Sequence, residues 1–111
     1  MGSSPQRGEI WWVALDPALG SEIRKTRPCV IISVNVLNEK RRTIIVVPLS
    51  SSPKPSPPIL IPVNCRGRPG SAVTDQIRAL AKERRRSKLG VITSEELAAL
   101  EEALTQIMQL R

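Results

Sequence analysis

The sequence lacks histidine, tyrosine and phenylalanine altogether, and it holds only two cysteines. Without histidine, the commonest general acid and base of enzymes is missing. Cys29 and Cys65 are too few for a structural zinc site, and we expect neither a bound metal nor a cofactor. Trp11 and Trp12 are the only aromatic residues, so the core has to be built from valine, isoleucine, leucine and alanine.

Long apolar runs are also missing. No stretch approaches the roughly 20 apolar residues that span a bilayer, and the polar start of the chain is unlike a signal peptide. We therefore expect no association with a membrane and a cytoplasmic location, where both cysteines stay reduced. The length of 111 residues predicts a single domain over residues 1–111.

Positive charge is in excess: 17 lysines and arginines oppose 10 aspartates and glutamates, which gives a net charge of +7. Basic residues dominate from Arg66 to Lys88, whereas the segment from Thr93 onward is mainly acidic. Such a charge distribution indicates a polyanionic partner, and the preference for arginine over lysine suits phosphate. A basic surface that serves only solubility is the alternative interpretation.

Short β-rich stretches separated by turn residues make up most of the chain. They predict strands over residues 9–15, 28–34, 43–49, 59–63 and 72–79. The second and third strands would form a hairpin, and Pro62 would place the fourth at a sheet edge. Connecting segments of other kinds are predicted as turns at 35–41 and 66–70, an exposed Pro- and Ser-rich loop at 50–58, and one helical turn at 82–86.

The clearest local signal lies near the C-terminus. Thr93 and Glu96 have the spacing of a capping box, and Ile92 and Leu97 that of a hydrophobic staple. Apolar residues then recur at helical spacing on one face as far as Met108. The sequence therefore predicts a mainly β protein with a C-terminal helix, in which the helix packs on a small barrel of strands.

Several blocks of residues, taken in order, resemble one bacterial family. They are Arg7-Gly8-Glu9-Ile10-Trp11-Trp12, Gly20-Ser21-Glu22, Lys25-Thr26-Arg27-Pro28, Val47-Pro48-Leu49-Ser50 and Thr74-Asp75-Gln76-Ile77-Arg78. A single block would be weak evidence. Together they cover essentially the whole chain and resemble the MazF/PemK family, the toxins of type II toxin–antitoxin systems that are known as mRNA interferases.

This resemblance implies an SH3-like β-barrel of the kind shared by MazF, PemK and CcdB toxins, assembled as a homodimer. It implies a sequence-selective, ribosome-independent endoribonuclease that cuts single-stranded mRNA without a metal, with the substrate's own 2′-hydroxyl as nucleophile. The products would carry a 2′,3′-cyclic phosphate and a 5′-hydroxyl. It also implies a cognate acidic antitoxin, whose initially disordered segment wraps over the toxin, and a net charge of +7 suits such a partner.

Three residues match positions that are functional in this family. Arg27 matches its catalytic arginine, whose guanidinium can donate two hydrogen bonds to a phosphate and is better suited to stabilising charge than to moving protons. Ser50 stands where the family commonly has threonine; it keeps the hydroxyl and loses the methyl that would stiffen its rotamer. Gln76 matches a glutamine whose amide could hold the RNA backbone or contact a base edge.

Asp75 and Glu22 are the candidate general bases, and Asp75 equally fits a salt bridge to a neighbouring arginine. If residues 72–79 form one strand, Gln76 and Arg78 share a face and Asp75 points the other way. With so few aromatic residues, RNA binding should depend on phosphate contacts rather than on stacked bases. The residues predicted to make RNA contacts are Lys25, Thr26, Ser51, Ser52, Lys54, Arg66, Arg68, Arg78, Arg84 and Arg85.

Two functions of other classes compete with the nuclease. A non-enzymatic toxin of the same fold poisons DNA gyrase and depends on its extreme C-terminus, including a tryptophan near the end; this chain ends Met108-Gln109-Leu110-Arg111, without one. The second alternative is a catalytically silent SH3-like module that only binds RNA. Binding and cleavage would use the same basic surface, so the sequence does not separate them.

The first prediction concerns metal removal. Because the chain has no histidine and Asp75 and Glu83 are the only acidic residues between Arg66 and Lys88, it does not offer the clustered acids of a two-metal nuclease. We expect cleavage of a long single-stranded RNA to proceed at an unchanged rate in EDTA. Activity that disappears in EDTA and returns with Mg²⁺ or Mn²⁺ would contradict this mechanism.

Overall fold

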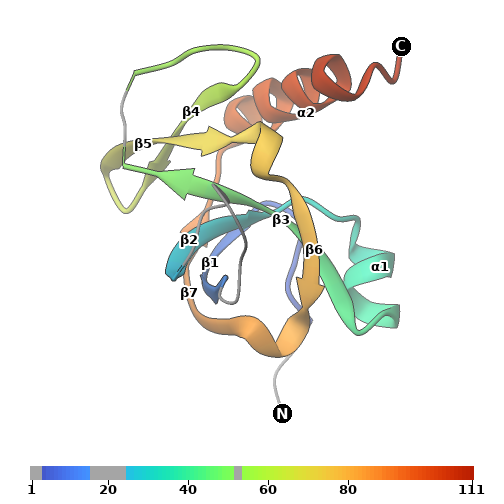
Figure 1. The fold of residues 1–111 in the computed structure, drawn as a ribbon. Coiled ribbons are helices and arrows are strands. Elements are labelled where there is room, and N and C mark those ends of the chain that lie inside the picture. Colours follow the sequence, from blue (N-terminus) through green and yellow to red (C-terminus); the bar gives the residue numbers. More distant parts are fainter. Residues whose placement is uncertain (1–3, 16–24, 52–53) are drawn as a thin grey trace.

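The sheet is arranged around β3 (Thr43–Ser50) (Figure 1). One edge of β3 pairs with β2 (Thr26–Ile31), β2 pairs with β1 (Glu9–Ala14), and β1 pairs with β7 (Arg85–Val91). All three pairings are antiparallel. The structure is a computed structural model that describes residues 4–15, 25–51 and 54–111.

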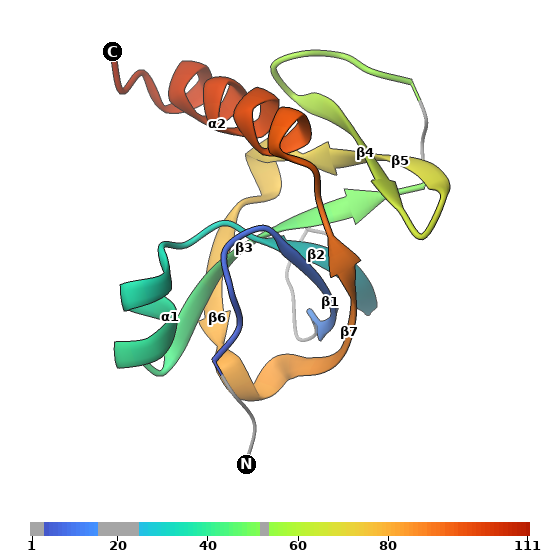
Figure 2. The same cartoon turned by 180° about the vertical axis from the view of Figure 1, so that it is seen from behind.

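The other edge of β3 is divided between two strands. Its second half pairs with β5 (Arg68–Val73) and its first half with β6 (Arg78–Ala81). β4 (Leu60–Cys65) pairs with β5 and ends the sheet, which confirms the edge position expected from Pro62. The described strands form a 7-stranded sheet in the order β4-β5-β3-β2-β1-β7, with β6 beside β3, and it curls into the half-open barrel seen in Figure 2.

The prediction of one continuous strand over residues 72–79 is wrong. A 3₁₀ turn, η1 (Thr74–Gln76), separates β5 from β6, so that two residues of β3 face residues 73–77. One of the two is Pro48, which has no N–H to donate to a ladder. The buried Thr74 holds the corner, because its hydroxyl lies 2.7 and 3.1 Å from the carbonyl oxygens of Pro58 and Ile59.

The segment predicted as a turn between the second and third strands contains a short helix, α1 (Asn35–Lys40). The two strands do pair, as expected, but not through a tight hairpin. Asn38 is fully buried and donates to the Ser33 carbonyl oxygen at 2.9 Å, while the Ser33 hydroxyl donates to the Asn38 side-chain oxygen. The same hydroxyl accepts from the Ile45 N–H at 3.0 Å, so this polar cluster fastens α1 to β3.

The sequence also left β7 unpredicted. The helical turn expected at 82–86 is present as η2 (Lys82–Arg84), but the chain then extends into a strand that pairs with β1. The first residues of that strand are arginine, arginine, serine and lysine, which have low strand propensity. Pairing with β1 prevails over this local preference.

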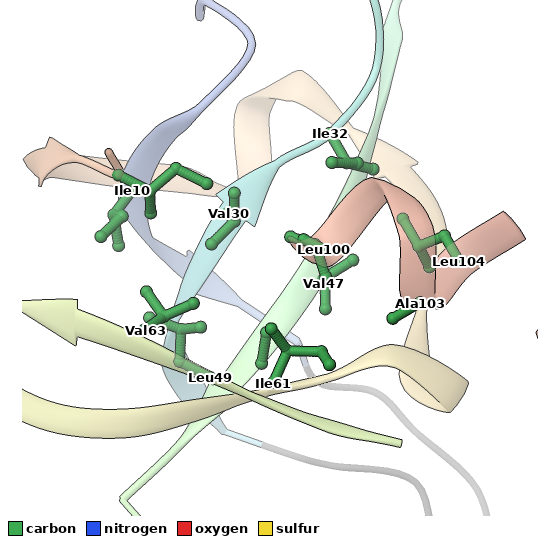
Figure 3. Close-up of a cluster of buried hydrophobic side chains, with 12 residues drawn as sticks. Ile10, Val30, Ile32, Val47, Leu49, Ile61, Val63, Leu100, Ala103 and Leu104 are labelled. Carbon is green, nitrogen blue, oxygen red and sulfur yellow. The ribbon is translucent and has the colours of Figure 1, made fainter. Parts of the chain in front are cut away.

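The core lies on both faces of the sheet. Figure 3 shows the cluster between the sheet and the C-terminal helix α2 (Ser94–Met108), in which Ile10, Val30 and Leu100 are buried. A second cluster lies on the other face, against which Trp11 packs. Trp12 points the opposite way and keeps 36% of its surface exposed, so the two tryptophans divide between core and surface.

α2 begins and packs as the sequence predicts. The Glu96 N–H donates to the Thr93 hydroxyl at 3.1 Å, and the Thr93 N–H donates to the Glu96 carboxylate at 2.8 Å, which completes the capping box. Leu100 and Leu104 are buried, whereas Met108 at the end of the helix is 45% exposed. In the part of the chain that the structure describes, no helix has the length and apolar character needed to cross a membrane.

A substitution at Asn38 tests the polar cluster under α1. Asn38→Ala leaves the buried Ser33 hydroxyl and carbonyl without their partner, and we expect it to lower the free energy of unfolding by about 1–3 kcal/mol. Glu39→Ala, on the exposed side of the same helix, is the control and should change stability by at most about 0.5 kcal/mol. Urea unfolding measures both, and equal effects would contradict the role given to Asn38.

Candidate active site

A groove of about 600 Å³ opens where β2 begins and β3 ends. Its apolar lining comes from Trp12, Pro28, Leu49, Val63, Cys65, Pro69 and Leu89. Its polar lining comes from Thr26, Arg27, Ser50, Ser51, Arg66 and Arg68. Among the described residues that line this groove there is no carboxylate, so its charge is positive throughout.

Arg27 lies in the second position of β2, with its side chain exposed. The residue before a proline is restricted to extended backbone, so Pro28 holds Arg27 in the strand conformation that pairs it with Val13 of β1. The Arg27 carbonyl oxygen also accepts from the Cys29 thiol at 3.6 Å. Arg27 is therefore carried by a fixed backbone, although its guanidinium faces solvent.

Ser50 ends β3 and reaches the same groove from the neighbouring strand. It pairs with Ser71 of β5, and it is half-buried. Gly70 makes this arrangement possible: a Cβ atom at that position would lie 2.7 Å from the Ser50 carbonyl oxygen. Only glycine lets β5 pass so close to the backbone of Ser50.

The third side of the groove comes from the hairpin of β4 and β5. Arg66 and Gly67 form its two-residue turn and both have positive φ, 52° and 78°, the geometry of the tight turns that match strand twist. The Arg66 Nε donates to the Leu89 carbonyl oxygen of β7 at 3.0 Å. This hydrogen bond ties the hairpin tip to β7 and holds the guanidinium at the groove.

The structure thus brings together six of the residues that the sequence singled out: Thr26, Arg27, Ser50, Ser51, Arg66 and Arg68. Lys25 and Lys54 are exposed on the connections next to the groove and are not part of its lining. Glu22 and Ser52 lie outside the described residues. The roles of all ten residues stay predictions.

The remaining candidates lie elsewhere on the chain. Asp75 and Gln76 are in η1, so the shared strand face expected for Gln76 and Arg78 does not exist, and neither η1 residue lines the groove. Arg78 and Arg84 line a separate cavity of about 310 Å³ beside Leu15. Arg85 stacks on Trp11, with its guanidinium carbon 4.6 Å from the ring centroid.

The two thiols are unsuited to nucleophilic chemistry. Burial raises the pKa of Cys29 to about 12, and the Arg78 charge offsets this only in part. Burial also raises the pKa of Cys65, which lines the groove, although the positive charge of Arg66 lowers it in part. Both cysteines therefore stay protonated at neutral pH, and the reactive groups of the groove are guanidinium and hydroxyl.

Sequence reasoning missed two residues of the groove. Trp12 is absent from the residues predicted to contact RNA, but its exposed ring forms part of the groove wall. Gly70 was placed in a turn, whereas it lies within β5 at the close approach to Ser50. A glycine inside a strand pattern can mark such an approach, and this was the available signal.

Fold and groove together define a small curled β-barrel protein whose candidate site is a basic groove. Residues 6–108 match the family described as PemK-like, MazF-like toxin of type II toxin–antitoxin system. The endoribonuclease MazF9 of Mycobacterium tuberculosis is 37% identical to this chain over 113 residues, which cover 89% of this chain and 92% of that protein. The endoribonuclease toxin MazF of Escherichia coli K12 is 33% identical, with 84% of each chain covered.

Solved structures agree on the fold. MazF from Deinococcus radiodurans superposes with a TM-score of 0.86 at 23% identity and covers 97% of this chain and 99% of that one. A mycobacterial endoribonuclease in complex with its cognate antitoxin gives 0.81 at 21% identity, with 97% and 98% covered. The chain belongs to the PemK-like, MazF-like family of type II toxins.

Gly70 provides a test of how the groove is built. A Cβ at Gly70 meets backbone rather than a movable side chain, so we expect Gly70→Ala to cost about 1–3 kcal/mol of stability and to shift the Ser50 amide signal in NMR spectra. Gly90→Ala, where no atom lies within 4 Å of the added carbon, should leave stability and the Ser50 signal close to those of the wild type. An unchanged Ser50 signal in Gly70→Ala would show that the contact does not position Ser50.

Proposed function

We propose that this toxin is an endoribonuclease that cuts single-stranded RNA in the groove between β2, β3 and the β4–β5 hairpin. One observation carries the proposal: Arg27 and Ser50, which come from separate strands, line one basic groove together with Arg66 and Arg68. Family membership supports it, because the relatives from M. tuberculosis and E. coli are both named as endoribonucleases.

The reaction needs the 2′-hydroxyl of the RNA, a cation at the phosphate and a base that accepts a proton. The 2′-oxygen attacks the adjacent phosphorus and loses its proton, and the bond from phosphorus to the 5′-oxygen breaks as that oxygen takes up a proton. The products carry a 2′,3′-cyclic phosphate and a 5′-hydroxyl. Negative charge grows on the phosphoryl oxygens in the transition state, and a preorganised cation at that point lowers the barrier most.

Arg27 is the cation assigned to this task. Its planar guanidinium can hold two phosphoryl oxygens at once, and its backbone is fixed by β2 and Pro28. We assign to Ser50 a hydrogen bond from its hydroxyl to a phosphoryl oxygen, and to Arg66 and Arg68 contacts with neighbouring phosphates. Glu22 remains the candidate general base in the family's Gly-Ser-Glu block.

The partners follow from the same surface. We propose an acidic antitoxin that competes with RNA for the positive groove; support comes from the net charge of +7 and from the structural neighbour solved in complex with its cognate antitoxin. We also propose a homodimer, since the exposed Met108 and Leu110 at the end of α2 border a second cavity with Ile45 and Ile77. We propose a cytoplasmic location, because the proposed substrate is mRNA.

Arg27→Ala separates catalysis from binding. If Arg27 stabilises the transition state, single-turnover cleavage should fall by a factor on the order of a hundred to a thousand. RNA affinity should fall far less, because one lost phosphate contact to a single strand changes the slope of log K against log salt by only about 0.7. Arg27→Lys keeps the positive charge but loses the planar guanidinium that donates two hydrogen bonds at once. Compared with Arg27→Ala, it should restore RNA binding more fully than turnover.

The controls for this experiment are a thermal melt and Arg111→Ala, which removes an arginine from the far end of the chain. Both Arg27 variants should melt like the wild type, because Arg27 is exposed and contributes no buried side chain. If Arg27→Ala cleaves at the wild-type rate but binds RNA weakly, Arg27 is a docking residue. If the wild type binds RNA and never cleaves it, the silent binding module is the better interpretation.

A further inference from the structure

A second basic surface lies away from the groove. Residues 39–42 and 82–86 hold seven of the 17 basic residues of the chain and two of its ten acidic residues. The two segments adjoin, because Thr43 pairs with Ala81 and the Lys82 N–H donates to the Arg42 carbonyl oxygen at 2.9 Å. In Figures 1 and 2, α1 and the turn that precedes β7 lie together, at the end of the molecule opposite α2. We call this the α1–η2 surface.

Among the residues that the structure describes, no carboxylate forms an ion pair with Lys40, Arg41 or Arg42. All three side chains are exposed. The cations that do form ion pairs with described carboxylates are Arg7, Lys88 and Arg111, and none of them belongs to this surface. Lys88 illustrates the contrast. It lies 3.0 Å from the Glu9 carboxylate, which also accepts from the Trp11 indole N–H, and so its charge is already compensated within the fold.

Two arginines of the surface are held in place by backbone carbonyls. The Arg85 Nε donates to the Lys82 carbonyl oxygen at 3.3 Å, and the Arg86 Nη1 donates to that of Glu83 at 2.9 Å. Arg85 also stacks on Trp11. A guanidinium has five N–H donors, so each bond to a carbonyl positions the group and leaves further donors for an anion.

The surface is joined to the groove through β1. Val13 pairs with Arg27 on one side and with Arg85 on the other, so these two arginines stand two strand spacings apart, roughly 10 Å. β3 makes the second connection: Ser50 ends it at the groove and Thr43 begins it beside Arg42. Eight residues at about 3.3 Å each separate the two ends by more than 20 Å.

We propose that the α1–η2 surface binds the phosphates of RNA that flanks the cleavage site, so that the enzyme contacts a longer strand than the groove alone can hold. The proposal rests on the proposed function, since it adds a second contact region for the same substrate. A phosphate chain fits the observations better than an acidic peptide does, because Arg85 lies two strands from Arg27 and continues the cations of the groove in which the RNA is proposed to bind.

The test uses two RNAs with the same mapped cleavage site, one that only spans the groove and one extended on both sides. The variant is Arg41→Gln/Arg42→Gln. A phosphate contact to a single strand contributes about −0.7 to the slope of log K against log salt. Loss of two contacts should lower the slope for the extended RNA by about 1.4 and its affinity at 0.1 M salt by about 25-fold. Binding and cleavage of the short RNA should stay as in the wild type.

The matched control removes the same net charge elsewhere. Ala99→Glu/Gln106→Glu adds two negative charges to exposed positions of α2, and it should weaken binding of the extended RNA far less. If both variants weaken it equally, only net charge matters and the proposal is wrong. The proposal is also wrong if the wild type binds both RNAs equally, or if the arginine variant binds the extended RNA normally and instead loses a poly-glutamate peptide.

The two proposals fail in distinguishable ways. If the wild type cleaves no single-stranded RNA, so that no site can be mapped, the proposed function fails, while binding of a short and an extended RNA of arbitrary sequence still decides whether the surface contacts flanking phosphates. If the short RNA is cleaved and the extended one gains no affinity, the nuclease stands and the second contact region does not. A thermal melt of both variants shows whether either substitution disturbs the fold, and a loss of short-RNA cleavage in a folded arginine variant would place these residues in the groove instead.

Discussion

β3 pairs with other strands along both of its edges, and the positions of the groove and of the α1–η2 surface depend on this pairing. β2 occupies one edge, while β5 and β6 share the other on either side of η1. The end of the strand places Ser50 next to Arg27, and its beginning places Arg42 next to Lys82. Backbone hydrogen bonds, rather than side chains, determine which of these residues are neighbours. The close approach of the Gly70 backbone to that of Ser50 is therefore as important to the groove as the side chains that line it.

The fold was predictable where local chemistry and tertiary packing agree. The capping box of Thr93 and Glu96 and the edge strand with Pro62 are examples, and the family blocks led to the groove at Arg27 and Ser50. Prediction failed where pairing overrides composition: the charged start of β7 becomes a strand because β1 pairs with it. The sequence pattern around η1 does not predict that the strand breaks there. The break is stabilised by hydrogen bonds from Thr74 to carbonyl oxygens some 15 residues away in the sequence.

The chemistry of the groove follows from what the chain lacks. With no histidine, and with both thiols kept protonated by burial, the described lining offers charge and hydrogen bonds rather than a proton shuttle. RNA suits such a site because it brings its own nucleophile in the 2′-hydroxyl. Apart from a carboxylate such as Glu22 that could accept the proton, the main contribution of a protein with this composition is electrostatic stabilisation of the phosphorane, which is the largest single contribution in many enzymes.

Anchored arginines give this small protein an advantage with a flexible substrate. A free surface arginine loses side-chain entropy when it binds, by roughly 0.5–1.5 kcal/mol per ordered side chain. Arg66 on the Leu89 carbonyl and Arg86 on the Glu83 carbonyl are ordered by the fold instead. The entropy lost on binding then comes mainly from the RNA, and each further anchored cation along the strand adds affinity without a matching loss in the protein. A chain of 111 residues with two aromatics can therefore hold single-stranded RNA chiefly by its phosphates.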